Sequence, residues 1–281
     1  MLRIRLRLGL GRWVTMLGMA LAVAAPAAAQ GVLLTLVDGD AVVIDGARRG
    51  AAAPGLRIAP ATIVETGAKT TLLRLEWPDK SVIDLGPSTR VMVLPPGFKP
   101  RSGRPAAIYL LQGWIKVAGN GTSPAGGVLA PALEVLPFSG AAVVFANKRD
   151  GYVFAESGPV EVADRASGGA QRGLPPGGLW SADGTVAARP PADWPPKVPR
   201  AFRDTIPMRA ALFKDRVVNA SALPPPTYVD LADWLAAEPS LRRDFPRRFA
   251  ALAQDAAFRR ALQGRLSAHP EWAPVLNPPQ R

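Results

Sequence analysis

The sequence offers carboxylates and hydroxyls for chemistry, but it has almost none of the sulfur and imidazole groups that many catalytic and metal sites require. It contains no cysteine and a single histidine, His269. The absence of cysteine excludes disulfides, thiol nucleophiles and thiolate metal sites. One histidine excludes histidine-rich metal sites and leaves little for proton transfer near neutral pH. We therefore expect no cofactor and no bound metal ion.

Aspartates cluster at Asp38, Asp40 and Asp45. An Asp-x-Asp pair can ligate calcium, but a calcium loop needs more oxygen ligands at fixed spacing. Because Asp38 precedes Gly39 and both residue types favour turns, we predict a turn at this position instead of a metal site.

Two further carboxylates, Asp79 and Asp84, flank a short predicted strand. A hydrolase with paired carboxylates needs two acids at a set separation in a cleft, whereas a turn and a solvent-facing position account for both residues. Ser139 and Ser157 precede glycines, but neither lies in a Gly-x-Ser-x-Gly motif. His269 follows the last predicted helix, where a cation would cap the carboxyl end. These patterns predict that the chain is not an enzyme and has no catalytic residues.

Binding chemistry is better represented, by arginine pairs near the carboxyl end and by tryptophans in a Gly/Pro-rich stretch. Guanidinium groups bind phosphate and carboxylate in a bidentate manner, and exposed indoles bind sugars or proteins. The alternative is a solvated helix face whose arginines pair with Asp244, Asp255 and Glu238. The candidate partner-binding residues are Arg242, Arg243, Arg247, Arg248, Arg259, Arg260, Trp180 and Trp194.

The elements that must position these residues begin with a mainly β region, residues 30–165. Its boundary extends to 186 if the 178–186 segment returns a strand. Short apolar or alternating runs, separated by Gly, Pro, Asp and Asn, indicate a sandwich, a barrel or a solenoid-like fold. The predicted strands include residues 40–44, 71–77, 81–85, 89–94, 108–117, 132–136, 141–145, 151–155 and 159–162.

A Gly/Pro-rich linker is predicted at 166–199. Seven prolines lie between Pro175 and Pro199, and we expect no compact core there because proline removes backbone donors and stiffens the chain. Residues 200–276 are predicted to be a small α-helical region, followed by a tail at 277–281. Helices are expected over 208–218, from a Thr227 cap to about residue 237, along a stripe from Leu241 to Leu252, and from an Asp255 cap onward.

The first 29 residues have the order of a secretory signal peptide. Four arginines precede an apolar run from Trp13 to Ala25, and Ala27-Ala28-Ala29 supplies a small-residue cleavage site. We predict cleavage after Ala29 and a periplasmic location; the alternative is an uncleaved anchor helix. We expect no membrane-spanning helix after cleavage.

The net charge of the chain indicates which chemical class of partner it binds. The formal net charge is +12, and removing the four arginines of the signal peptide leaves about +8. A basic surface favours acidic partners, such as an envelope protein or an acidic cell-wall polymer. Export removes the protein from nucleic acid, which we therefore exclude as a partner.

The β segment also carries a recognisable series of steps. Thr66-Gly67 precedes the strand Leu72–Trp77, and Pro78-Asp79-Lys80-Ser81 leads into the strand Val82–Leu85. A threonine-led strand starts at Thr89, followed by Leu111-Gln112-Gly113 before a strand and by Gly158-Pro159 before the last strand.

This pattern resembles the periplasmic FecR domain over residues 35–185, with Lys80 standing where the family often has glycine. Members that regulate iron uptake have a cytoplasmic domain that acts on a sigma factor, whereas only twelve residues precede the apolar run here. The resemblance therefore implies a periplasmic binding, scaffold or envelope-signalling module without that cytoplasmic region.

Three functional hypotheses follow. The first is an exported, non-enzymatic FecR-domain protein that binds a partner. The second is a peptidoglycan- or glycan-binding envelope protein that uses arginines and tryptophans. The third is a carboxylate-dependent hydrolase.

Overall fold

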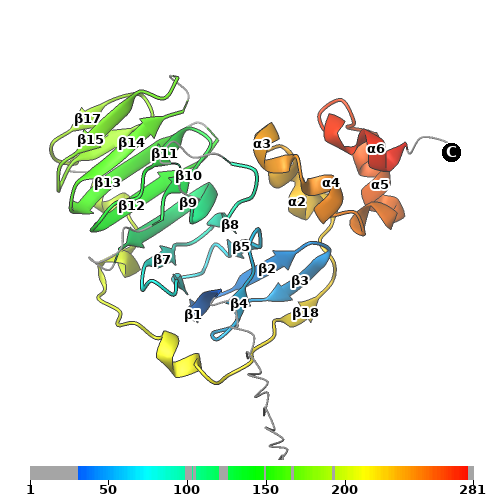
Figure 1. The fold of residues 1–281 in the computed structure, drawn as a ribbon, viewed down its shortest axis with the longest axis horizontal. Coiled ribbons are helices and arrows are strands. Elements are labelled where there is room, and N and C mark those ends of the chain that lie inside the picture. Colours follow the sequence, from blue (N-terminus) through cyan, green and yellow to red (C-terminus); the bar gives the residue numbers. More distant parts are fainter. Residues whose placement is uncertain are drawn as a thin grey trace, which may run out of the picture. The chain divides into compact units, whose positions relative to one another are not determined.

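The computed structural model describes residues 31–98, 103, 106–119, 126–148, 150–165, 168–191 and 194–277. These residues form a continuous, mostly antiparallel sheet that curls into two facing layers, followed by short helices (Figure 1). The predicted fold class, mainly β with a small helical carboxyl-terminal region, is confirmed. The predicted signal peptide at 1–29 lies outside the described residues.

The first layer, layer A, is antiparallel throughout. It includes the carboxyl-terminal half of the longest strand, β9 (Ile108–Ala118). On one side of β9, from the edge inward, lie β4 (Arg57–Ile58), β1 (Val32–Asp38), β6 (Leu72–Glu76) and β7 (Val82–Leu85). On its other side, from β9 outward, lie β12 (Ala141–Ala146), β13 (Gly151–Ser157), β16 (Leu179–Ser181) and β17 (Val186–Ala187).

The second layer, layer B, contains the amino-terminal half of β9, which pairs in parallel with β10. On one side of β9, from the edge inward, lie β18 (Ser221–Leu223), β3 (Arg48–Ala51), β2 (Ala41–Asp45), β5 (Ile63–Thr66) and β8 (Arg90–Val93). On its other side, from β9 outward, lie β10 (Val128–Leu129), β11 (Leu133–Val135), β14 (Val160–Asp164) and β15 (Gln171–Leu174).

β9 joins the two layers because it bends in the middle. Residues 108–112 pair with β8, whereas residues 113–118 pair with β7 and β12. Gly113 sits at the bend with φ 101°, and a Cβ at this position would lie 2.5 Å from the Cα of Thr89. Only glycine accepts both this backbone conformation and this close approach.

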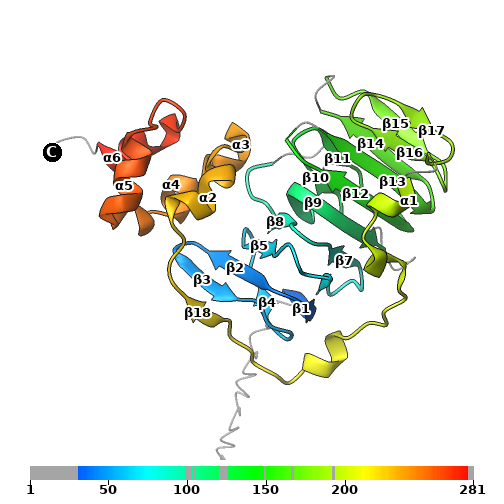
Figure 2. The ribbon, with the colours of Figure 1, turned by 180° about the vertical axis from the view of Figure 1, so that it is seen from behind.

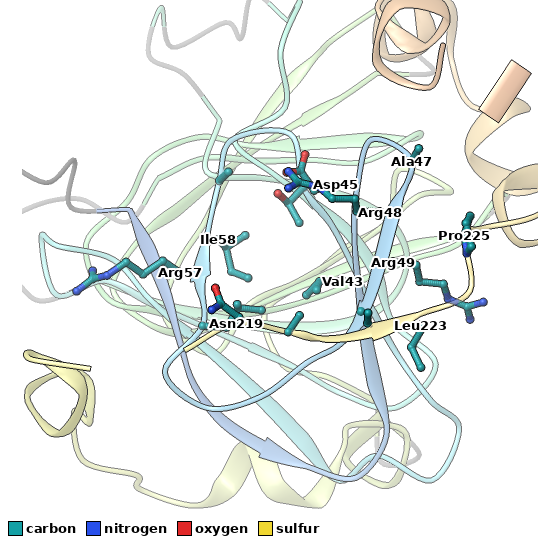
Figure 3. Close-up of a pocket in the computed structure, with 16 residues that line it drawn as sticks. Val43, Asp45, Ala47, Arg48, Arg49, Arg57, Ile58, Asn219, Leu223 and Pro225 are labelled. Atoms are coloured by element: carbon teal, nitrogen blue, oxygen red, sulfur yellow. The ribbon is translucent and has the colours of Figure 1, made fainter. Parts of the chain in front are cut away.

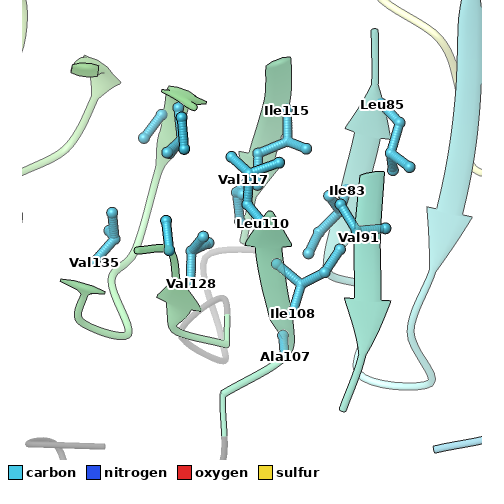
Figure 4. Close-up of a cluster of buried hydrophobic side chains, with 14 of the residues drawn as sticks. Ile83, Leu85, Val91, Ala107, Ile108, Leu110, Ile115, Val117, Val128 and Val135 are labelled. Carbon is cyan, nitrogen blue, oxygen red and sulfur yellow. The ribbon is translucent and has the colours of Figure 1, made fainter. Parts of the chain in front are cut away.

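The main core lies between the inner faces of the two layers. Alternate residues of each strand point inward, so that Leu85 and Ile115 of layer A meet Val91 and Leu110 of layer B (Figure 4). Trp180 of β16 belongs to the same core, at 1% exposure. The Gly/Pro-rich stretch predicted to have no core therefore contributes a fully buried indole.

The threonines and glycines of the FecR-like pattern lie at strand corners. The Thr66 hydroxyl donates to the Gly86 carbonyl (2.6 Å) and accepts from the Thr89 amide (2.9 Å). The Thr89 hydroxyl in turn accepts from the Trp114 amide at 3.0 Å, directly beside Gly113. The threonines thus occur at these positions because their hydroxyls bond to backbone groups that have no strand partner where the strands end.

The turn before β7 has the predicted chemistry. Asp79 Oδ1 accepts from the Ser81 amide (2.9 Å) and the Ser81 hydroxyl (2.6 Å). Lys80 has φ 67°, a left-handed conformation that favours glycine.

A segment that we call the strap, residues 194–213, lies against the outer face of layer A. It contains α1 (Trp194–Lys197) and the 3-10 turns η1 (Arg200–Arg203) and η2 (Ala210–Phe213). Phe202 is buried against this face, and its carbonyl accepts from Lys116 Nζ at 2.7 Å. The strap is therefore fixed to the sheet at Phe202.

Buried charges anchor the strap further along. Arg74 Nη1 donates to the Ile206 carbonyl at 2.6 Å. The Glu76 carboxylate accepts from the amides of Arg209 and Ala210, at 2.9 Å each. The helix predicted over 208–218 is wrong: only η2 forms there, because the segment has no continuous apolar stripe to bury and continues toward the edge strand β18.

The outer face of layer B is covered by the carboxyl-terminal helices, which we call the helical layer (Figure 2). The predicted caps are confirmed at Thr227, which forms a capping box with Asp230, and at Asp255. The elements are α2 (Tyr228–Leu235), α3 (Pro239–Arg242), α4 (Phe245–Arg248), η3 (Leu252–Gln254), α5 (Ala256–Gln263), η4 (Pro270–Trp272) and α6 (Ala273–Leu276).

A second core forms between the helical layer and layer B. Ile63 and Met92 of the sheet contact a cluster that includes Trp234, Phe245 and Phe249. Among the described residues, no helix is long and apolar enough to cross a bilayer.

Candidate partner-binding surface

Each arginine pair of the helical layer contains one anchored side chain. Arg242 Nη1 donates to the Ala268 carbonyl at 2.5 Å, and Arg259 Nη2 donates to the Leu276 carbonyl at 2.6 Å. Arg248 Nη2 contacts Asp45 Oδ1 of β2 at 3.0 Å. These three residues, the anchored arginines, hold the helices to one another and to layer B.

The other member of each pair is exposed. Arg247 has an 85% exposed side chain and a weak contact of 3.8 Å with Asp244. Arg243 and Arg260 are also exposed and have no ion pair within the described part of the chain. Consecutive residues of a helix point in directions about 100° apart, so a pair places one guanidinium inward and the other in solvent. We call Arg243, Arg247 and Arg260 the exposed arginines.

The two candidate tryptophans are not on the surface, and the expectation of partial exposure is wrong. Trp180 is 1% exposed and Trp194 is 4% exposed. Trp194 packs against Trp114 and Tyr152, with ring centroids 5.5 and 5.0 Å apart. Pairing of β16 with β13 and docking of the strap bring these indoles inside. They are therefore removed from the set of candidate binding residues.

The sequence also suggested that Asp244, Asp255 and Glu238 pair with the arginines of this helix face. Of these three acids, only Asp244 contacts an exposed arginine, Arg247. Asp255 caps α5 through the Phe258 amide. Glu238 makes a two-bond contact with Arg165, at 2.7 and 2.5 Å. Among the described residues, Arg247 thus has only the distant Asp244 as a partner, and Arg243 and Arg260 have no carboxylate partner.

Charged residues of both layers that sequence analysis missed bind helix α2 of the helical layer: Arg90 and Glu65 come from layer B, and Lys148 comes from the turn between β12 and β13 of layer A. Asp233 of α2 accepts from Arg90 Nη1 (2.5 Å) and Lys148 Nζ (2.7 Å), and these cations, Lys148 foremost, lower the pKa of its carboxyl group. Trp234 Nε1 donates to Glu65 Oε1 at 2.8 Å. Burial raises the pKa of Glu65. No local pattern marks these pairs, because their members lie far apart in the chain.

Asp84 is buried, contrary to the solvent-facing position expected. Its two carboxylate oxygens accept from Nε and Nη2 of Arg74, at 2.7 and 2.8 Å. Antiparallel pairing of β6 with β7 places the two residues directly opposite each other. Its carboxylate therefore serves an ion pair, and Asp79 serves the turn described above.

His269 is buried at 3% exposure and does not act as a cationic cap, so that expectation is also wrong. Its Nε2 lies 2.9 Å from the Tyr228 hydroxyl. Burial lowers the pKa of the imidazole, which favours the neutral form.

The early aspartates lie as predicted for a turn: Asp38 ends β1 and Gly39 has φ 118°. No group of three or more potential metal ligands occurs among the residues that the structure describes.

Comparison with family models finds no match. No curated protein matches the chain either. Two crystal structures of a "putative anti-sigma factor" from Parabacteroides distasonis, at 2.50 and 1.65 Å resolution, are similar in part. Each is 16% identical and covers 44% of this chain and 57% of that chain, with TM-scores of 0.34 and 0.33. The chain thus spans little more than half the length of those solved chains.

Proposed function

We propose that this chain is an exported, non-enzymatic periplasmic protein whose FecR-like β domain is a scaffold and whose helical layer binds an acidic protein of the cell envelope. The observation that carries the proposal is the division of the arginine pairs. The anchored arginines hold the helices in place, and the exposed arginines project from this fixed surface. Because the backbone that carries the exposed arginines is already fixed, binding to carboxylates orders only their side chains.

The FecR-like part of the proposal is supported by the corners of the sheet. The Thr66–Thr89–Trp114 chain of hydrogen bonds and the left-handed Lys80 give a structural reason for steps of the pattern. Such a domain, with a helical layer on one face, is suited to an envelope-signalling module in which a partner docks on the helices.

We expect the exposed arginines to control partner binding without contributing to stability. The test is capture from envelope extracts by the wild type and by the triple variant Arg243→Gln/Arg247→Gln/Arg260→Gln. The triple variant should lose most of the captured protein at low salt, with a Tm within about 2 °C of wild type, because exposed charges contribute little to folding.

The anchored arginines supply a matched control of the same residue type. Arg248→Gln leaves the exposed arginines in place but removes the contact with Asp45, and should lower Tm while capture at a temperature well below Tm continues. Equal capture by wild type and the triple variant would contradict the proposal.

Binding to peptidoglycan is the second candidate, since the exposed arginines also suit an acidic polymer. The burial of Trp180 and Trp194 removes the aromatic contribution that it would have used. Co-sedimentation with purified peptidoglycan distinguishes the two: pelleting that falls with salt, and that the triple variant loses, would favour the polymer. The proposal assigns no catalytic role to Asp79 or Asp84.

Export is tested separately. Amino-terminal sequencing of protein released by osmotic shock should start at Gln30. Retention of an intact amino terminus in the membrane fraction would favour the anchor-helix alternative.

A further inference from the structure

A cavity of about 440 Å³ opens at the free edge of the two layers, between β4 of layer A and β2, β3 and β18 of layer B (Figure 3). Its apolar wall includes Val43, Leu56 and Ile58, which belong to the main core or pack against it. The cavity is therefore the end of the inter-layer core that the chain's own side chains leave unfilled. Its volume and apolar lining are typical of small-ligand sites.

One end of this cavity is polar. Asp45 and Arg48 lie together there, and Val43 and Ile58 lie between them and Asn219 in Figure 3. The β2–β5 register pairs Ile44 with Ile63, which puts Thr62 opposite Asp45 when continued by one step. Thr62 also lines the cavity.

Thr62 is the residue that most clearly indicates a ligand in this cavity. It is 3% exposed, and its hydroxyl has no hydrogen-bond partner among the described residues. Side chains alternate along a strand, so Thr62 shares the inward face with Val64, a member of the main core. A buried hydroxyl without a partner is costly, and a ligand oxygen that reached it from the cavity would remove this cost.

Charge at this end favours an anion. Asp45 is contacted by two guanidinium groups, Arg48 at 3.1 Å and Arg248 at 3.0 Å, so that positive charge is in excess. The Arg48 side chain is 86% exposed and retains N–H donors for a further acceptor. Arg57 also lines the cavity but extends away from it (Figure 3).

We propose that this cavity binds a small anionic amphiphile, with its hydrocarbon chain between Val43, Leu56 and Ile58 and its acidic headgroup at Thr62 and Arg48. The apolar wall excludes a fully polar ligand, and the hydroxyl and guanidinium require an acceptor at one end. None of these residues belongs to the exposed arginines of the helical layer, so the two proposed sites use different side chains for binding.

The test is calorimetric titration of the purified chain with decanoate, below its micelle concentration, and with decanol as the neutral analogue. We expect saturable binding of one decanoate per chain, with decanol at least tenfold weaker. Arg48→Gln should weaken decanoate binding by about tenfold, the effect of one charge-assisted hydrogen bond. Arg172→Gln, an exposed arginine on the distant edge strand β15, is the matched control and should bind as wild type does.

Two further variants separate ligand binding from folding. Thr62→Val removes the unpartnered hydroxyl with little change of shape, so it should weaken decanoate binding while Tm is unchanged or higher. Asn219→Trp should occlude the cavity from its exposed side and abolish binding.

A second arm with vesicles containing phosphatidylglycerol distinguishes a free amphiphile from a membrane surface. Decanoate binding without vesicle pelleting indicates a free ligand, and both together indicate that the same headgroup chemistry is taken from a bilayer. The proposal is overturned if decanoate does not saturate, if decanol binds equally, if Arg48→Gln matches Arg172→Gln, or if vesicles bind while decanoate does not.

Discussion

At the scale of single residues, the polar side chains of this protein act mainly on its own backbone and on one another. Arg74 and Asp84 illustrate this: both are buried, both come from neighbouring strands, and Arg74 also holds the strap through the Ile206 carbonyl. A buried ion pair contributes little net stability when intact, but removing one partner leaves an uncompensated charge.

We expect Asp84→Asn to lower the free energy of unfolding by about 3–5 kcal/mol, because Arg74 stays buried without its counter-charge. The double variant Arg74→Met/Asp84→Leu should be much less destabilised. Urea unfolding followed by tryptophan fluorescence measures both. Asp183→Asn, in an exposed turn, is the control and should leave stability close to that of the wild type; a similarly small effect for Asp84→Asn would contradict the prediction.

His269 predicts a pH dependence. Burial lowers its pKa in the folded state, below the ordinary value of about 6.5, and Tyr228, Arg242, Arg265 and Glu271 surround it. The neutral form is therefore the one the fold favours. Stability attributable to His269 is complete above pH about 6.5 and is lost as the pH falls from there toward the folded-state pKa.

As the sole imidazole, His269 has a single set of ring signals in NMR spectra, whose titration midpoint should lie below that of a model peptide. His269→Gln should lose less stability than wild type between pH 7.5 and 5.0. A midpoint at or above the model value would show that the imidazole is not desolvated.

At the scale of elements, the bend of β9 determines how the two layers face each other. Gly113→Ala should lower the free energy of unfolding by about 2–5 kcal/mol, since it combines an unfavourable positive φ with overlap against Thr89. Gly173→Ala on the edge strand β15 is the control: an added Cβ meets nothing within 4 Å. Chemical denaturation measures the free energy of unfolding of both variants. Equal values would mean that the bend tolerates a side chain.

Most strands and both helix caps were predictable at this scale, because alternation, turn residues and capping residues act over a few positions. The strap was not. Its turns are stabilised by Lys116, Arg74 and Glu76 from the sheet, and local composition suggested only a linker. No helix forms over 208–218, and Leu212 and Val217 of this segment remain exposed, at 60% and 91%.

At the scale of the whole molecule, Gly31–Arg281 cluster as one compact unit. The strap shares hydrogen bonds and a small apolar cluster with the sheet, and the helical layer shares ion pairs and the second core with it, so we expect one cooperative unfolding transition. Far-ultraviolet circular dichroism and tryptophan fluorescence should give coincident curves, since Trp180 reports the main core and Trp234 the second core. Two separated transitions would show that the helical layer folds independently.

The sequence by itself determined the β-rich class, most strand positions, the Asp79 turn, the two helix caps and the arginine pairs as candidates. Only the tertiary structure decided which arginine of each pair is free, that Trp180, Trp194 and Asp84 are buried, and that an unfilled cavity ends at Thr62 and Arg48. The physical reason is the distance along the chain over which each kind of interaction acts. Propensity and alternation act between near neighbours, whereas contacts such as Trp234 with Glu65, 169 positions apart, depend on the path of the whole chain.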